Sequence, residues 1–420
     1  MIGNRGVSGP AVAIGIGMAW LAFGPAARAY GQAVRDSAGV RIVENARPLL
    51  PAARSWRVDP RPEVDIGGNE ATAGDTLYEF VRVNGAVRLS DGRIVVAVDG
   101  SLTLRFYDAR GRFVRSAGRD GDGPGEFRQL MGLHALRGDT LFVTDLGEVE
   151  YYTGDGRFAR RGASRATNDQ GYVWPAAVFD DGYYVGLDWN DTRAVPAGRQ
   201  VRSLPLVRVS ADGQRHDTIA TLPAMEQVFD GRGPFGRQVV FAPAASVAAG
   251  RDRFYHGFPI RYEITVFDRN GSVLSVIRRA ATRQRVTEAE REAYRSHTLQ
   301  AALSDPYHPT TRERAERSIA QTVFAEEYPF FADLLADRTG HLWVKHYDYR
   351  DRFMIPGRSS TRTIAVPTRW DVFDPRGAWL CTVELPARFT PFEIGADYVV
   401  GLARDTDDIE QVHLYRLLKP

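Results

Sequence analysis

The sequence predicts an all-β fold, a six-bladed β-propeller, and repetition is the main reason. Short β-rich runs separated by turn signals recur in units of about forty to fifty residues, and such four-stranded units, repeated radially, are typical of propellers. The clearest unit is 87–118, where turns at Asp91, Asp99 and Gly111 divide four runs. The pattern therefore indicates one large β-domain with internal repeats.

Similar units follow along the chain, and most of them end in a hairpin with a turn glycine. The glycines that we place between third and fourth strands are Gly111, Gly156, Gly213, Gly271 and Gly377. A last copy begins near Phe392 and stops after its third strand, which makes six units. We expect residues 56–66 to supply the missing strand, to pair beside the C-terminal strand and so to close the ring.

The segment 287–324 interrupts the repeat with residues that favour helices. Thr287 stands three residues before Glu290, and Thr310 stands three residues before Glu313, so each pair is typical of a capping box. We therefore expect a helical hairpin between the fourth and fifth blades.

This insertion has two interpretations. Pro306 and Pro309 separate its two halves. The hairpin could brace the rim of the propeller, or it could cover a pocket as a lid. We expect its histidines, His297 and His308, to face the solvent.

The first 29 residues have the pattern of a secretory signal peptide. Arg5 gives a positive start, 11–23 is an apolar run too short to span a bilayer, and Ala27 and Ala29 form a small-x-small ending. We expect cleavage after Ala29 and a periplasmic or secreted protein, with an uncleaved membrane anchor as the alternative. The expected organisation is a signal peptide (1–29), an N-terminal extension (30–55) and the propeller (56–420).

Composition excludes some classes of function. The 54 basic and 52 acidic residues nearly cancel and form no basic block, so we expect no nucleic-acid partner. The only cysteine, Cys381, lies in a strand-like stretch and has no partner for a disulfide. We expect the mature chain to be a monomer that does not insert stably into a membrane.

The glycine-rich stretch 118–127, "GRDGDGPGEF", lies between the first and second units. Its glycines and Pro124 suit a sharp corner of the chain. Asp120 and Asp122 have the spacing of a calcium loop, but Pro124 stands where a third ligand belongs. We interpret the stretch as a structural corner, with a rim contact through Arg119, Asp120 or Asp122 as the alternative.

The second strands of the six units end on polar residues that we expect around the channel mouth. They are Asp99, Asp145, Asp188, His256, His346 and Arg404. Converging imidazole and carboxylate groups could bind a ligand or a metal, with His256 and His346 as the metal candidates. Alternatively, each carboxylate closes its own turn by accepting backbone N–H groups.

The repeats, the loop at 118–127, the helical insertion and the C-terminal stretch 388–418 resemble exported bacterial six-bladed β-propeller proteins related to the NHL-repeat group. The resemblance covers Trp56 to Pro420 and implies the fold without an activity. Related lactonase-like and amidating-lyase-like propellers imply a metal-dependent hydrolase or lyase as an alternative. In that enzyme His256 and His346 would bind the metal, and a carboxylate of the channel-mouth ring (Asp99, Asp145 or Asp188) would be a ligand or the general base.

The sequence contains no Gly-x-Ser-x-Gly elbow and no His-Glu-x-x-His pair. We therefore expect an exported scaffold that binds a small molecule, a glycan or a protein without catalysing a reaction. It would need no cofactor, with a divalent metal as the alternative.

Overall fold

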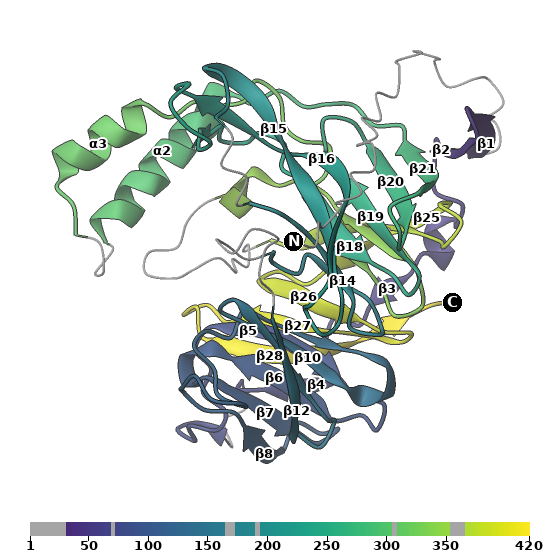
Figure 1. The fold of residues 1–420 in the computed structure, drawn as a ribbon, viewed down its shortest axis with the longest axis vertical. Helices are drawn as coiled ribbons and strands as arrows, with labels where there is room; N and C mark the ends of the chain where they lie inside the picture. The colour runs from purple at the N-terminus through teal and green to yellow at the C-terminus, as the bar shows by residue number, and fades with distance from the viewer. Residues whose placement is uncertain (1–30, 69–71, 164–172, 190–193, 305–308, 353–365) are drawn as a thin grey trace, which may run out of the picture.

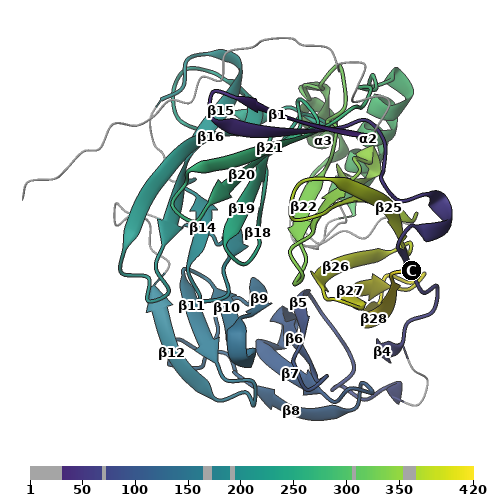
Figure 2. The ribbon, with the colours of Figure 1, turned by 90° about the vertical axis from the view of Figure 1, so that its right-hand side faces the viewer.

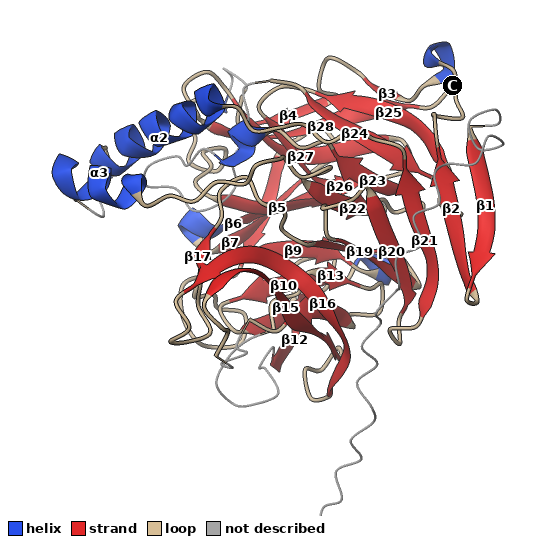
Figure 3. Ribbon diagram, turned by 90° about the horizontal axis from the view of Figure 1, so that it is seen from above, coloured by secondary structure: helices blue, strands red, loops and turns tan. Residues whose placement is uncertain are grey.

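The computed structural model describes residues 31–68, 72–163, 173–189, 194–304, 309–352 and 366–420. The expected signal peptide, the cleavage site after Ala29 and His308 lie outside these residues. Strands dominate the described chain, and the two α-helices lie together at one side (Figure 3).

The described strands form six sheets of four to six strands. The first sheet is β5–β8 (Val83–Arg88, Ile94–Val98, Thr103–Tyr107, Phe113–Ala117). The second is β9–β12 (Gly132–Ala135, Leu141–Asp145, Glu148–Tyr152, Phe158–Ala163). The third is β13–β17 (Ala177–Val178, Tyr184–Leu187, Gly198–Val209, His216–Phe229, Arg237–Gln238).

The remaining sheets each continue the order of the chain. The fourth is β18–β21 (Ser246–Ala249, Arg253–Gly257, Glu263–Asp268, Val273–Arg279), extended by β2 (Val40–Asn45) and β1 (Gln32–Ser37). The fifth is β22–β25 (Asp333–Ala336, Leu342–Lys345, Thr368–Phe373, Trp379–Leu385). The sixth is β26–β28 (Phe389–Ile394, Tyr398–Arg404, Glu410–Leu418), joined by β3 (Arg57–Val58) and β4 (Val64–Ile66).

The sheets stand around a common centre, which makes the fold propeller-like and all-β (Figure 2). The first strands of neighbouring sheets contact one another near the centre, as β5 does with β9 and β18 does with β22. Apolar clusters fill the spaces between sheets; one of them joins Val83 of the first sheet to Val400 and Leu402 of the sixth. Burial of apolar surface between neighbouring sheets therefore holds the sheets together.

The five hairpin glycines are confirmed as turn residues between third and fourth strands. Gly111, Gly156, Gly213, Gly271 and Gly377 all have φ between 71° and 88°. This left-handed backbone is unfavourable for residues with a Cβ, which explains why glycine recurs there.

Two N-terminal segments add strands to distant sheets. β3 and β4 pair with β28, with Val58 opposite Leu417 and Ile66 opposite Val412, which is the pairing expected for residues 56–66. β2 runs parallel to β21, so part of the extension at 30–55 belongs to the fourth sheet. Asn45 fixes this extension, because its amide donates to Arg278 O and Gly377 O, both at 3.0 Å.

The helical hairpin consists of α2 (Glu288–Leu303) and α3 (Arg312–Ala320), between β21 and β22. Thr287 and Glu290 form the expected capping box. The expected cap at Thr310 is wrong by one residue: Thr311 Oγ1 accepts the Arg314 N–H at 3.3 Å. Two adjacent threonines offer the same capping chemistry, and the helix uses the second.

The hairpin lies beside the third sheet (Figure 1), and aromatic residues attach it to the segment that follows β17. Tyr294 of α2 lies 5.5 Å from Phe241 and 5.6 Å from Phe324 between ring centroids, and Val240 N–H donates to Val323 O at 2.8 Å. His297, which we expected to face the solvent, is half-buried on α2. No helix in the described ranges is both long and apolar enough to cross a membrane.

Candidate functional site

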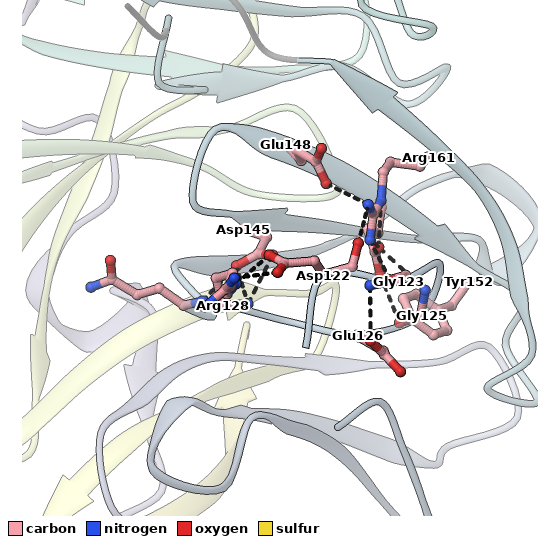
Figure 4. A network of polar contacts seen from close by, with 11 residues as sticks. Asp122, Gly123, Gly125, Glu126, Arg128, Asp145, Glu148, Tyr152 and Arg161 are labelled. Carbon is pink, nitrogen blue, oxygen red and sulfur yellow. Dashed lines mark hydrogen bonds and ion pairs between the residues drawn. The ribbon is translucent and has the colours of Figure 1, made fainter. Parts of the chain in front are cut away.

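The corner loop 118–127 is held by its own side chains and by Arg161 of β12, which donates to Asp122 O and Gly123 O (Figure 4). Arg119 forms an ion pair with Glu126 at 2.6 Å, and Glu126 Oε2 accepts the Gly123 N–H at 2.8 Å. Asp122 forms an ion pair with Arg128, while the backbone of Asp120 bridges to Phe127. The charged side chains of Arg119 and Asp122 are thus engaged within the loop or next to it, whereas Asp120 is held through its backbone.

Asp99 and Asp145 bind the backbone that follows this loop. Asp99 Oδ1 accepts the Leu130 N–H at 2.9 Å, and Asp145 Oδ1 accepts the Gln129 N–H at 2.6 Å. Arg128 N–H also lies 3.1 Å from both Asp145 oxygens. Both carboxylates are buried, and each holds the connection between the first and second sheets in place.

The other members of the ring have different partners. His256 is buried, with Nε2 3.1 Å from Pro223 O, and burial lowers the pKa of this imidazole to about 4. Arg404 donates to Glu410 at 2.5 Å. Asp188 is buried at the end of β14, and its N–H donates to Pro205 O at 2.8 Å.

The six ring residues thus contact different partners. Among the residues that the structure describes, no three His, Cys, Asp or Glu side chains are grouped so that they could hold a metal ion. His256 and His346, the metal candidates, contact different groups in different sheets.

His346 belongs to a cluster around a wholly buried carboxylate, Asp371 of β24. Asp371 Oδ1 lies 3.0 Å from His346 Nε2 and accepts from Thr382 Oγ1 at 2.6 Å. Asp371 Oδ2 accepts from Tyr262 Oη at 2.6 Å and lies 3.2 Å from Arg279 Nη1. We call these five residues the carboxylate cluster.

The cluster keeps Asp371 ionised. Burial alone would raise the pKa of Asp371, but His346, Arg279 and Thr382 together lower it. Burial, together with the Asp371 charge, raises the pKa of Tyr262 well above its ordinary value, so its hydroxyl remains a donor. The cluster is therefore a buried anion with donors on each of its oxygens.

A cavity of about 460 Å³ lies beside this cluster, and Arg279 and His346 line it. The other lining residues come from the segments before and after the helical insertion, from the first turn of α2 and from the turn after β23: Ala281, Thr282, Arg283, Gln284, Glu290, Tyr328, Pro329, Phe330, Tyr347, Asp348 and Tyr349. We call it the aromatic cavity. Its volume lies in the range of small-molecule sites.

The tyrosines of the aromatic cavity pack as a group. Tyr328 lies 5.3 Å from Tyr347 and 6.2 Å from Tyr349 between ring centroids, and Phe241 packs on Tyr328 from behind at 5.5 Å. The same apolar cluster anchors the helical hairpin, so the insertion supports one wall of the cavity.

The charged groups that line the aromatic cavity have partners nearby. Arg283 pairs with Glu327 at 3.0 Å and donates to Tyr328 O at 3.1 Å. Glu290 accepts from the Thr287 N–H at 2.8 Å, and Asp348 pairs with Arg350. The lining thus offers donors and acceptors without a strong excess of one charge.

A second cavity of about 480 Å³ lies near the centre, where the turns between first and second strands of all six sheets meet. Glu393 is buried there between Tyr398 Oη at 2.6 Å and Arg338 Nε at 3.1 Å. Arg338 also donates to Ala135 O at 2.9 Å, which links the fifth sheet to the second. These contacts satisfy Glu393 and Arg338 within the protein.

Sequence reasoning found His346 but missed Asp371, Tyr262, Arg279 and Thr382. One signal was available for Asp371: in "TRWDVF" a single acid interrupts an otherwise apolar strand end. Lys, Glu, Arg and Asp are rarely fully buried unless paired, so such an acid predicts nearby donors, although it does not identify them.

No protein-family model and no curated protein sequence matches this chain. Among solved structures, the chain is similar to a DUF4221 family member from Bacteroides vulgatus, with 8% identity, a TM-score of 0.50 and coverage of 87% of this chain and 99% of that one. It is also similar to a putative exported protein from Bacteroides fragilis (12%, TM-score 0.47, coverage 90% and 99%). A gluconolactonase from Xanthomonas campestris is a third (14%, TM-score 0.41, coverage 88% and 99%). At these sequence identities the likeness concerns the fold alone. Only the TM-score of 0.50, for the DUF4221 family member, supports a shared fold.

Proposed function

We propose that this protein is an exported six-bladed β-propeller that binds a small neutral molecule in the aromatic cavity. The observation that carries the proposal is a cavity of about 460 Å³ that combines a group of packed tyrosines with the buried carboxylate cluster. Pockets of this size with a few placed polar groups are the usual sites of small ligands.

The blade count and the closure rest on strand pairing and packing. Six sheets in chain order, with β3 and β4 paired to β28 and an apolar cluster between the first and last sheets, support a ring closed by the N-terminal segment. Export rests on the signal-peptide pattern of residues 1–29.

A neutral ligand suits the electrostatics of the cavity. Arg283 and Asp348 already have partners of opposite charge, and Arg279 faces Asp371. A charged ligand would have to lose water without gaining an unpaired counter-charge, which costs free energy. A flat ring can lie against Tyr347 and Tyr349 while its polar substituents reach the charged side chains.

Binding can be tested with three probes of the same shape: neutral 4-nitroacetanilide, anionic 4-nitrobenzoate and cationic 4-nitrobenzylammonium. We expect the neutral probe to bind best by isothermal titration and to raise the melting temperature. Ala281→Trp should fill the cavity and abolish binding, because Ala281 lines it and is exposed.

The matched control is Ala53→Trp, which adds the same side chain at an exposed position in the 3-10 turn Ala52–Arg54, outside the cavity lining. Equal binding by both tryptophan variants would place the ligand elsewhere. Tighter binding of either charged probe would contradict a neutral ligand.

A further inference from the structure

Three histidines of the described chain lie near a carboxylate, and one of them differs from the others in position. The distances are 3.0 Å for His346 and Asp371, 3.1 Å for His341 and Asp337, and 3.4 Å for His413 and Asp65. Only His346 lines the aromatic cavity. The pair His346–Asp371 therefore has access to a ligand there.

The carboxylate determines which ring nitrogen of His346 carries the proton. Nε2 lies 3.0 Å from the ionised Asp371 without being aligned for a hydrogen bond, and the negative charge alone makes the neutral imidazole most stable with its proton on Nε2. Nδ1 then keeps its lone pair, and no hydrogen bond joins it to a described residue. Because His346 lines the cavity and its Nε2 is the buried ring nitrogen, Nδ1 is the nitrogen that can accept a proton from a group there.

Asp371 also stabilises the charged ring that such a transfer creates. It is wholly buried, and Tyr262, Thr382 and Arg279 fix its two oxygens. An imidazolium at His346 would gain a close ion pair, while the carboxylate itself would not need to move.

We propose that His346, positioned by Asp371, is a general base that activates water against small neutral esters bound in the aromatic cavity. This inference rests on the proposed ligand site. The described residues that line the cavity include no serine or cysteine, and we assign the role of nucleophile to water.

The reaction needs no other reactant. His346 Nδ1 takes a proton from water as the water oxygen forms a bond to the ester carbonyl carbon. Arg283 uses Nε and Nη1 for its contacts with Tyr328 O and Glu327, and its Nη2 group can donate to the carbonyl oxygen as negative charge develops there. The bond between that carbon and the alcohol oxygen then breaks, and the imidazolium returns the proton to the alcohol. The products are an acid and an alcohol, and nothing is oxidised or reduced.

p-Nitrophenyl acetate is a suitable probe, because it is small, neutral and flat and releases coloured p-nitrophenolate. We expect saturable hydrolysis by the full-length protein, and a fall in kcat/KM of about 10²-fold in His346→Gln. His341→Gln is the matched control, since it removes a histidine of a similar pair outside the aromatic cavity, and its rate should equal that of the unaltered protein.

Asp371 is a positioning residue, so its test needs a pH profile. In Asp371→Asn, loss of the negative charge should shift the acidic limb of kcat/KM to lower pH, with KM little changed. Arg279, Tyr262, Glu290 and Asp348 face the same region and remain in both proteins. If this variant does not fold, His346→Gln still decides the question.

Binding of 4-nitroacetanilide separates the two proposals, because this amide is not hydrolysed under these conditions. If the amide binds in the cavity but His346→Gln hydrolyses the ester as fast as the unaltered protein, the base is wrong and the binding site stands. If the amide does not bind, the proposed function fails together with this inference.

Discussion

The second and fifth sheets place a buried carboxylate at the same strand position and use it differently. Glu150 of β11 and Asp371 of β24 each lie opposite the third residue of the second strand. The fourth strand presents Arg161 to Glu150 and Thr382 to Asp371, and each donates to its carboxylate, at 2.7 Å and 2.6 Å. The two sites are therefore equivalent in the repeat.

The connections that lead into the second and fifth sheets also make the same backbone hydrogen bond to the second strand. Met131 N–H donates to Thr144 O in the second sheet, and Ala332 N–H donates to Lys345 O in the fifth, both at 2.8 Å. Counting back from these bonds places Arg128 and Pro329 at equivalent positions.

Beyond these positions the two connections follow different paths. In the second sheet the N–H groups of Arg128 and Gln129 reach Asp145, and the connection folds over Glu150. In the fifth sheet Pro329 has no N–H, and the next residue, Phe330, donates to Pro259 O of the fourth sheet at 2.9 Å. The connection stays away from the strand end, where His346 replaces Asp145. The strands of the second and fifth sheets are arranged alike. The path of the connection that leads into each sheet determines whether a cavity forms at the strand end.

The largest expected effect is the loss of Asp371. Asp371→Ala should lower the free energy of unfolding by about 3–5 kcal/mol, because Arg279 would remain in the interior without its counter-ion. Urea unfolding followed by circular dichroism measures this. A loss below about 1 kcal/mol would mean that water reaches the cluster and screens it.

The corner loop of the second sheet gives the next effect. Gly118→Ala should cost about 2 kcal/mol or more, since φ is 84° and an added Cβ would lie 2.2 Å from the Phe127 ring. Gly39→Ala is the matched control: φ is 79°, but no atom lies within 4 Å, so only the backbone cost of about 1 kcal/mol applies. Equal losses of stability in the two variants would show that the loop shifts to accommodate the added Cβ without further cost.

Removal of Asp145 should have a somewhat smaller effect. Asp145→Ala leaves the Arg128 and Gln129 N–H groups without their acceptor and should cost about 1–3 kcal/mol. Asp145→Asn keeps one acceptor oxygen and should cost less. Amide exchange should quicken at residues 128–130 in the alanine variant, whereas unchanged exchange there would argue that Asp145 does not hold the loop.

The smallest effect is a contrast in pH dependence. The pKa of Asp371 is below its ordinary value of 3.8, so its contribution to stability is present above that value and is lost as pH falls through the folded-state pKa. Burial raises the pKa of Glu150 above 4.5, although Arg161 opposes this, so its contribution is present below 4.5 and is lost as pH rises.

Stability measured from pH 3 to 7 for Asp371→Asn and Glu150→Gln checks this contrast. The difference from the unaltered protein should grow with pH for Asp371→Asn and shrink with pH for Glu150→Gln. If the stability difference changed with pH in the same direction for both variants, the two carboxylates would not be in contrasting environments.

The repeating features of the fold could be predicted from sequence because they depend on local chemistry. Turn glycines such as Gly271 and Gly377 and the cap at Thr287 each report a backbone requirement at their own position. The pairing of residues 56–66 with β28 followed from the incomplete last unit. By contrast, the parallel contact of β2 with β21 has no local signal, since it depends on a partner more than two hundred residues away.

The candidate site was less predictable. His346 was found because the strand ends align, but Asp371 and Tyr262 act through side chains that meet only when the fourth and fifth sheets pack. For Asp99 and Asp145 both a ligand role and backbone bonding were open, and their contacts are with backbone N–H groups. The burial of a carboxylate and the identity of its partners distinguish a ligand role from backbone bonding. Neither can be predicted from a single sequence.

The attachment of the N-terminal strands has a consequence for the order of folding. Asn45 bonds to Gly377, 332 residues away, and Val83 N–H donates to Glu410, 327 residues away. These contacts cannot form until the ribosome has made nearly the whole chain. Their high contact order makes the last steps of folding slow, because a long loop must close before the contacts can stabilise it. β3 and β4 therefore stay without their partner β28 until the last strand of the chain has been made, although β1 and β2 can already pair with each other.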